Sequence, residues 1–345
     1  MTDPVKFLCP LLLLAVSCSD KSIAVHDAVS DSVCVLKENL ALVKSPASFA
    51  MTGDAGFVLS DYENVYLYGM DGSQKLQIGH PGRAKYEYNV PTVVRCFGDS
   101  VYVWSSFSLK FISYAIDGTP GAEYPYGSAI ADFAPSDGKL FIYTAGRRLD
   151  HVVDVYDKAS GKVTDSLSRS TSEHQFLLIE GAKAPMYFDG KELLFMPKDR
   201  IMLMHYDPVT NSGGTLSALV SNTFKVEKGL SGDLLDKDEE KALAKLDESS
   251  LTMCLWPGRT GYYALTREGK AQIINGERDN GDVYYGLYEI GPDGGHIDSY
   301  RYDSIGTLRL FSSWGSDLYY ISHSIEEEED VYVLKRLALQ AGKQD

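Results

Sequence analysis

Short runs of alternating apolar and polar residues, each ending in a tight turn, recur along most of the chain. The first complete example runs from Val65 to Met70 and ends at Asp71-Gly72. Asp-Gly between two alternating runs is the strongest short-range signal of a β-hairpin. Further turns contain Asp117, Asp157, Asp207 and Asp293, at intervals of 40 to 50 residues and one longer interval of 86. A period of 40 to 50 residues is typical of a β-propeller, in which each blade has four short strands.

Each repeat can be divided into four predicted strands. The six repeats begin near residues 48, 92, 130, 185, 251 and 308, and the sixth contains only three strands. The run from Ser32 to Val43 is a spare strand ahead of the first repeat. We expect it to complete the last blade, because closing the ring hides a sheet edge that would otherwise promote aggregation. The sequence therefore predicts an all-β fold, a six-bladed β-propeller over residues 32–340 that is closed by its N-terminal strand.

The longest interval between repeats contains an insertion, residues 221–250. Its sequence is rich in strong helix formers, and Leu235, Ala242, Leu243 and Leu246 fall on one side of a helix. The pattern predicts one short amphipathic helix that lies on the ring.

The first residues have the pattern of a signal peptide. Lys6 precedes an almost wholly apolar run, Phe7 to Val16, which is too short to span a bilayer. The segment Ala15-Val16-Ser17-Cys18 resembles a bacterial lipobox, in which the cysteine is lipidated and becomes the first mature residue. We predict a lipoprotein signal peptide at residues 1–17, lipidation of Cys18 and a polar tether at residues 18–31. A plain secretory signal with an incidental cysteine is the alternative.

The predicted location is the cell envelope. In bacterial lipoproteins, a serine such as Ser19 after the lipidated cysteine favours sorting to the outer membrane, on a side that the sequence leaves open. No second apolar run of 18 or more residues exists, so no transmembrane helix is predicted. The chain has 33 basic and 48 acidic residues, a net charge of -15, and such a surface repels phosphate backbones. We therefore expect a membrane contact through the lipid and a protein or glycan partner, but no nucleic acid.

Three cysteines remain after the signal and the lipidation site: Cys34, Cys96 and Cys254. Cys96 and Cys254 each lie in an apolar, strand-like run, which favours free buried thiols. A disulfide between these two is possible only if their strands are neighbours.

One loop phrase resembles a known family. The segment Ile78-Gly79-His80-Pro81-Gly82, followed by Glu87-Tyr88, is similar to the loop that joins blades in NHL-like and TolB-like six-bladed propellers. The turn Tyr114-Ala115-Ile116-Asp117-Gly118 resembles the Tyr-x-x-Asp-Gly turn of the same family. Together with the lipobox, the chain resembles the TolB-like propeller lipoproteins of Gram-negative bacteria. The resemblance implies a fold and an extracytoplasmic location, and it implies no catalytic residues.

Propeller geometry sorts the loops into two faces. Connections from the second to the third strand, and from one blade to the next, open on one face, which we call the long-loop face. The long or charged segments fall mostly in this set: residues 79–88, 146–151, 221–250, 275–282 and 326–330. Long loops on a rigid scaffold commonly carry binding sites, so we expect binding on this face.

Arg95 is a charge inside a predicted innermost strand. It can line the channel with Asp132 as its carboxylate partner, or it can bind an anion at the channel mouth. His80 and Arg83, in the connector after the first repeat, are further binding candidates. Trp256 and Trp314 can form a sugar-stacking platform with Trp104, or they can pack between blades.

The sequence predicts no metal site, cofactor or catalytic residue. The seven histidines lie far apart, and the innermost strands offer too few carboxylates for a Ca²⁺ site. The acidic run 326–330 fits a solvated hairpin tip. The leading functional hypothesis is a non-catalytic binding module that uses the long-loop face. Alternatives are a hydrolase or lyase that acts on a glycan or lactone in the channel mouth, and a structural subunit of an outer-membrane assembly.

Overall fold

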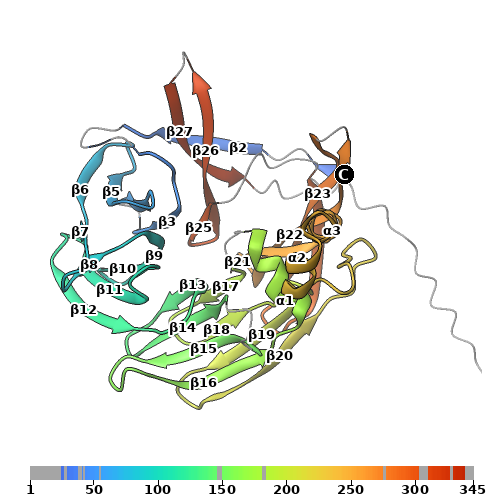
Figure 1. Ribbon diagram of the computed structural model, residues 1–345, viewed down its shortest axis with the longest axis horizontal. Coiled ribbons are helices and arrows are strands. Elements are labelled where there is room, and N and C mark those ends of the chain that lie inside the picture. The colour runs from blue at the N-terminus through green and yellow to red at the C-terminus, as the bar shows by residue number, and fades with distance from the viewer. Residues whose placement is uncertain are drawn as a thin grey trace, which may run out of the picture.

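The computed structural model describes residues 25–26, 29–37, 41, 43–53, 56–145, 150–180, 184–274, 277–302, 310–326 and 329–338. The predicted signal peptide, Cys18 and most of the predicted tether lie outside these residues. Within them, six sheets form a closed ring, which confirms the predicted six-bladed β-propeller (Figure 1). The first strand of each blade lies innermost, next to the first strands of the neighbouring blades. No helix among the described residues is long and apolar enough to cross a membrane.

Blades 1 to 3 each contain four strands in sequence order. Blade 1 has β3 (Ser48–Met51), β4 (Gly56–Ser60), β5 (Val65–Gly69) and β6 (Gln74–Gln77). Blade 2 has β9 (Pro91–Phe97), β10 (Ser100–Ser105), β11 (Lys110–Ala115) and β12 (Pro120–Pro125). Blade 3 has β13 (Ile130–Pro135), β14 (Lys139–Thr144), β15 (His151–Asp157) and β16 (Lys162–Arg169). The connector from blade 1 to blade 2 contains a parallel pair, β7 (His80–Pro81) and β8 (Glu87–Tyr88).

Blades 4 to 6 complete the ring. Blade 4 has β17 (Met186–Phe188), β18 (Leu193–Phe195), β19 (Met202–Asp207) and β20 (Ser212–Ala218). Blade 5 has β21 (Leu251–Pro257), β22 (Tyr262–Ile274), β23 (Glu277–Ile290) and β24 (His296–Tyr302). Blade 6 has β25 (Phe311–Trp314), β26 (Asp317–Glu326) and β27 (Glu329–Ala338) from the end of the chain.

The N-terminal part of the chain closes the ring. β2 (Val29–Val35) pairs antiparallel with β27 and supplies the outermost strand of blade 6, as expected. It begins and ends earlier than the predicted Ser32–Val43, and thus includes residues that had been predicted as tether. β1 (Val25–His26) adds a fifth, parallel strand to blade 5 beside β24, which the polar composition of this segment did not indicate.

The hydrophobic core is divided into six clusters, and each cluster joins two neighbouring blades. Between blades 2 and 3, for example, the ring of Phe111 lies 4.6 Å from Trp104 and 4.9 Å from Phe133, measured between centroids. Burying one such side chain stabilises the fold by about 1.5–3 kcal/mol. Apolar packing therefore holds each blade to both of its neighbours.

The insertion forms two helices where the sequence predicted one, α2 (Gly232–Lys237) and α3 (Glu239–Asp247). Asp238 separates them because its backbone is not helical, and its carboxylate caps α3 by accepting from Lys241 N at 3.1 Å. Ala242 and Leu246 are buried as expected, whereas Leu243 is 42% exposed. An unpredicted helix, α1 (Ser172–Leu177), continues into the 3₁₀ turn η1 (Leu178–Glu180) before blade 4.

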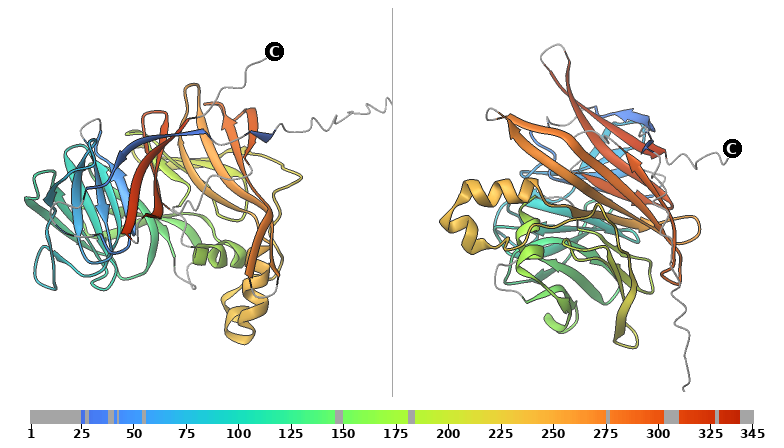
Figure 2. Two further views of the ribbon diagram at one scale, coloured as in Figure 1. Left: turned by 90° about the horizontal axis from the view of Figure 1, so that it is seen from above. Right: turned by 90° about the vertical axis from the view of Figure 1, so that its right-hand side faces the viewer.

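The expected loop at residues 275–282 is largely strand. β22 and β23 form a long hairpin in which Ile274 pairs with Glu277. The sequence here is polar, so apolar alternation could not reveal the strands. Figure 2 shows the helices on one side of the ring. This side is the long-loop face, because α1, α2 and α3 lie in connections from one blade to the next.

Candidate functional site

Arg95 and Asp132 form an ion pair in the channel. Arg95 lies on β9 and Asp132 on β13, the innermost strands of blades 2 and 3, and Nη2 of the arginine contacts Oδ1 of the aspartate. Their side chains are 13% and 2% exposed. Nη1 of Arg95 also donates to the carbonyl oxygen of Val94 at 2.6 Å and to Oγ of Ser48 at 3.2 Å. The predicted partnership between Arg95 and Asp132 is therefore present.

The same network reaches four blades. Oδ1 of Asp132 accepts from Phe133 N at 2.7 Å, and Oδ2 accepts from Ala184 N at 3.2 Å. Ala184 immediately precedes blade 4, and Ser48 begins β3 of blade 1. Ser48 and Ala184 lie on the side of the long-loop face, because the chain enters each innermost strand from that side, whereas Arg95 lies in the second half of β9. Arg95 and Asp132 thus satisfy each other while they connect the innermost strands.

His174 is buried beside this region. It lies in α1, it is fully buried, and its Nδ1 accepts from Lys198 N at 2.9 Å. Burial, and then the nearby charges of Lys198 and Arg200, lower the pKa of His174 to about 3. Because Nδ1 is an acceptor, the proton of the neutral ring is on Nε2. No hydrogen-bond partner of Nε2 is present among the described residues. The sequence gave no reason to separate His174 from the other histidines.

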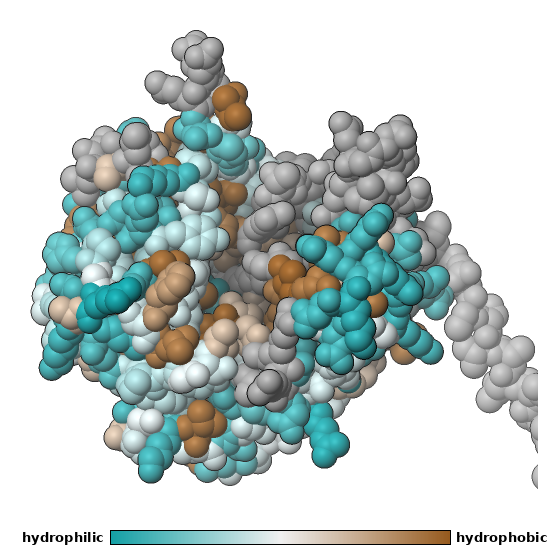
Figure 3. All heavy atoms as spheres, in the orientation of Figure 1, coloured by the Kyte–Doolittle hydropathy of each residue, from teal (hydrophilic) through white to brown (hydrophobic). Residues whose placement is uncertain are grey.

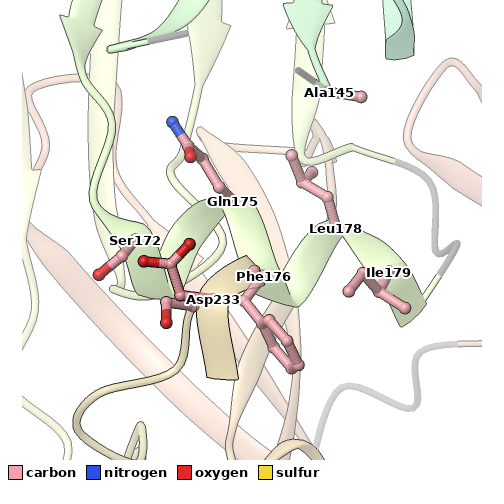
Figure 4. A pocket seen from close by; sticks show the side chains of 9 residues that line it. Ala145, Ser172, Gln175, Phe176, Leu178, Ile179 and Asp233 are labelled. Atoms are coloured by element: carbon pink, nitrogen blue, oxygen red, sulfur yellow. The ribbon is translucent and has the colours of Figure 1, made fainter. Parts of the chain in front are cut away.

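A cavity of about 340 Å³ opens on the long-loop face, between α1 and the beginning of α2 (Figure 4). Its size lies at the lower end of the range for ligand sites. Its lining residues are Ala145, Ser172, Gln175, Phe176, Leu178, Ile179, Ser231, Gly232 and Asp233. The apolar residues come from η1, the end of α1 and the end of β14, whereas Ser172, Ser231 and Asp233 supply polar groups.

The walls of the cavity are held by helix caps. Oγ1 of Thr171 accepts from His174 N at 3.0 Å and donates to Asp199 at 2.7 Å, which fixes the start of α1. Oγ of Ser231 accepts from Leu234 N at 3.2 Å and fixes the start of α2. The sequence analysis missed this cavity, because α1 is only six residues long and carries no strong apolar period.

The insertion is tied to blade 5 by Glu268, a carboxylate that is only 1% exposed. Hydroxyl groups donate to it from both sides: Tyr288 at 2.6 Å, Thr266 at 2.7 Å, Thr223 at 2.6 Å, Tyr284 at 3.3 Å and Ser221 at 3.4 Å. Ser221 and Thr223 belong to the start of the insertion, whereas the other three belong to β22 and β23. Burial, and then the carboxylate of Glu268, raises the pKa of Tyr288. This buried acid therefore holds the start of the insertion on blade 5, whereas Arg267 holds its end by donating to Leu246 O at 3.2 Å and to Ser249 O at 3.0 Å.

His80 and Arg83 are both exposed on the connector between blades 1 and 2. Two hydrogen bonds fix the connector to blade 2. The hydroxyl of Tyr114 donates to Tyr86 O at 2.7 Å, and Tyr86 N donates to Glu123 at 2.6 Å. Gly79 has a φ of +60°, and a Cβ there would lie 2.6 Å from the ring of Tyr114. The glycine of the blade-joining phrase is thus required by the close approach of that ring.

The proposed tryptophan platform is wrong for two of its three members. Trp104 and Trp256 are 1% and 0% exposed and pack within the inter-blade clusters. Trp314 is 45% exposed, but it lies at the turn between β25 and β26, on the face opposite the long-loop face. Its indole ring lies 3.3 Å from the position of a Cβ on Gly53. The three side chains belong to blades 2, 5 and 6 and do not form one platform.

Within the described part of the chain, Cys34, Cys96 and Cys254 form no disulfide. Cys96 lies in blade 2 and Cys254 in blade 5, so their strands are not neighbours. Burial raises the pKa of the Cys96 thiol to about 12. Within the described part of the chain, no group of three or more histidine, cysteine or acidic side chains is placed to hold a metal ion.

Apolar side chains are exposed singly on the long-loop face. Those in its loops and turns include Tyr62, Phe107, Ile179, Val220 and Leu243. Figure 3 views this face and shows brown residues separated by teal and white ones. The face is thus mixed in character, with several separate places for contact.

No protein-family model matches the sequence, and a comparison with curated proteins gives no match. Three of the solved structures with a similar fold come from Bacteroides. A Bacteroides fragilis protein that is assigned as exported has a TM-score of 0.62 and 16% identity, over 92% of this chain and 98% of its own. A member of the DUF4221 family from Bacteroides vulgatus has a TM-score of 0.63 and 12% identity, over 92% and 98%. A Bacteroides caccae protein of unknown function has a TM-score of 0.50 and 12% identity, over 84% and 96%. At these identities the likeness shows the fold of the chain and not its activity.

Proposed function

We propose that the protein is a lipid-anchored binding module of the cell envelope, attached through Cys18 to the outer membrane, and that its long-loop face contacts a protein or glycan partner. We also propose that the propeller is of the TolB-like or NHL-like kind, which the loop phrase from Ile78 to Tyr88 supports. The exported Bacteroides protein with the same fold agrees with a location outside the cytoplasm.

The observation that carries the binding proposal is the difference in loop length between the two faces. On the opposite face, strands are joined by short turns such as residues 98–99 and 208–211. The long-loop face carries the three helices, the connector of residues 78–90 and the cavity between α1 and α2. Such asymmetry is typical of a scaffold that presents recognition loops on one side.

The channel favours a binding role over the hydrolase or lyase alternative. Arg95 and Asp132, the charged residues that were predicted at its mouth, bond to each other and to the backbone. Neither side chain is left to act on a substrate. A role as a structural subunit of an outer-membrane assembly would use the same face and is an outcome of the test below.

Site-specific photo-crosslinking in the full-length protein tests the binding face. A photoreactive phenylalanine analogue would replace Ile179 or Leu243 on the long-loop face, and Val163 or Val209 on the opposite face; all four positions are exposed. We expect crosslinks to one discrete partner from the first pair in cells of a Gram-negative host. Crosslinks from Val163 and Val209 alone, or equal crosslinking from all four, would contradict the proposal. Crosslinks to subunits of one assembly would favour the structural role.

Mass spectrometry of the mature N-terminus tests the anchor. We expect a lipid-modified Cys18 as the first residue. An unmodified chain that begins at Ser19 or Asp20 would rule out lipidation and leave only secretion.

A further inference from the structure

We propose that the rim of blades 5 and 6, where the N-terminal strands lie, faces the outer membrane, and that the long-loop face is thereby turned away from the lipid. The partner of this rim is a lipid surface. The proposal rests on the proposed function, because it requires the lipid anchor at Cys18. It adds the orientation in which the anchored ring is held.

The chain joins the ring at the rim of blades 5 and 6. In β1, Val25 pairs with Arg301 of β24, the fourth strand of blade 5. Val29 then starts β2, which pairs with β27 and forms the outer edge of blade 6 (Figure 1). Contacts between the innermost strands place blades 5 and 6 across the ring from blades 2 and 3. The first described residues therefore lie on the outside of one half of the ring.

The predicted tether is short compared with the ring. Seven residue steps separate Cys18 from Val25, and an extended chain of that length spans at most about 25 Å. A folded domain of this length has a radius of gyration of about 20 Å, which corresponds to a sphere about 50 Å wide. Even if β1 were released, the eleven steps from Cys18 to Val29 would span at most about 40 Å.

These lengths decide which rim can face the bilayer. Because the lipid chains of Cys18 lie in the bilayer, Val25 stays within the reach of the tether from the membrane surface. If the rim of blades 2 and 3 faced the lipid, the N-terminal strands would lie a full ring width away, which is about twice that reach. The membrane therefore lies beside blades 5 and 6.

The direction of the N-terminal strands decides which face is turned away. β1 is parallel to β24, which starts after the turn of residues 291–295 on the face opposite the long-loop face. β2 starts beside Ala338, at the end of β27 that is farther from the long-loop turn of blade 6. The chain thus enters both strands from the side of the opposite face, and Figure 2 shows these blue strands on the side of the ring away from the helices. A membrane that holds Cys18 lies toward that side.

Charge does not hold this rim against the lipid. Arg336 on β27 bonds to Asp31 of β2 at 2.9 Å and lies 3.7 Å from Asp317, so two acids compensate it. The whole chain has a net charge of -15, and anionic phospholipids repel an acidic protein. The tether, and not attraction between the protein surface and the lipid, therefore sets the orientation.

Energy transfer to lipids tests the orientation in the full-length, lipid-modified protein. The vesicles contain phosphatidylethanolamine and phosphatidylglycerol, with a rhodamine-labelled lipid as the acceptor. A clickable amino acid that carries the donor dye replaces one of three exposed residues: Ile297 on β24 of blade 5, Val163 on β16 of blade 3, or Phe107 in the long-loop turn of blade 2. We expect transfer from position 297 to be at least about twice as efficient as from the other two.

The other patterns of transfer would overturn the proposal. Strongest transfer from position 107 would place the long-loop face on the lipid. Equal transfer from positions 297 and 163 would mean that the opposite face lies flat on the lipid or that the ring turns freely. An unmodified Cys18 in the mass spectrum would remove both the anchor and this orientation, whereas a lipid-modified Cys18 with equal transfer would remove only the orientation.

A longer tether is the matched control. A Gly-Ser linker of about 30 residues between Lys21 and Ser22 leaves the ring and the lipobox unchanged, and it adds a root-mean-square length of about 30 Å. We expect the difference in transfer between positions 297 and 163 to fall by at least about half, because the longer chain lets the ring turn. A difference that persists would show that the protein surface itself adheres to the lipid, which would contradict an orientation set by the tether.

Discussion

Arg95 and Asp132 meet across the boundary between blades 2 and 3, and the aspartate also accepts the backbone N–H of Ala184 at the start of blade 4. Because Oγ of Ser48 also accepts from the arginine, the ion pair connects three of the six innermost strands and the residue that leads into a fourth. The charge at position 95 is therefore a structural connection in the channel wall.

Removing one member of this pair should cost more than removing both. D132N leaves a nearly buried guanidinium without its counter-charge, and we expect it to lower the free energy of unfolding by about 3–5 kcal/mol. The double variant R95M/D132L should cost clearly less, because no buried charge remains. Urea denaturation measures both. A D132N variant within about 0.5 kcal/mol of the unsubstituted protein would show that the pair carries little stability.

His174 should make the protein less stable in mild acid. The folded pKa of about 3 lies below the ordinary value of 6.5, so the unfolded chain binds more protons between these pH values. Its contribution is fully present above pH 6.5 and is lost as the pH falls toward 3; between pH 7.5 and pH 5 the loss is about 2 kcal/mol. Urea denaturation at the two pH values should show this loss. In H174N, whose amide oxygen can still accept from Lys198 N, the difference should shrink by a similar amount, and an unchanged difference would contradict the assignment.

Gly79 and Gly98 separate two effects of adding a methyl group. Both have left-handed backbones, with φ of +60° and +55°, so alanine costs roughly 1 kcal/mol at either position. Only at Gly79 would the methyl group also meet the ring of Tyr114, at 2.6 Å, whereas nothing lies within 4 Å at Gly98. We expect G79A to lower the thermal midpoint at least twice as much as G98A. Equal shifts would mean that the ring of Tyr114 moves aside freely.

Glu268 should be far more sensitive to substitution than Glu289, a less buried acid on the same hairpin. E268A removes the acceptor of five hydroxyl groups. We expect the free energy of unfolding to fall by about 2–4 kcal/mol, because the buried donors lose their partner. E289A, which loses the bond from Thr260 and an interaction with the Tyr263 hydroxyl near the surface, should cost less than about 1 kcal/mol. Because the insertion starts at this carboxylate, E268A should also speed proteolysis within residues 221–250. Unchanged proteolysis would show that the helices are held by other contacts.

Much of the fold could be predicted from the sequence, because strands buried on one or both faces leave an apolar period and Asp-Gly turns mark their ends. The pairing of Arg95 with Asp132 was predictable for a similar reason, since a charge inside an apolar strand needs a partner. The polar hairpin around residues 275–282 carries no apolar signal. The division of the insertion at Asp238 depends on its backbone angles and its capping bond.

The cavity and the connector of residues 78–90 were only partly predictable. His80 and Arg83 could be recognised as exposed basic residues in a connector, but the exposure of Phe107 depends on a four-residue turn whose backbone is fixed by Asn89 and Val90. The cavity depends on the packing of α1 against α2, which lie far apart in sequence. The burial of Trp256 likewise depends on contacts between blades, which one sequence period cannot show.

The pairing of β2 with β27 also orders events during synthesis. Nη2 of Arg336 donates to Oδ2 of Asp31 at 2.9 Å, although the two residues are 305 positions apart. One of the first strands to be synthesised therefore pairs with the last of the described strands. Blades 1 to 5 can form their own hairpins from residues that are close in sequence, whereas blade 6 cannot be completed until β27 is present. Before that pairing the chain is an open arc, and it becomes a ring only when β27 meets β2. A chain that stops short of residue 331 would leave β2 without its partner and the arc open permanently.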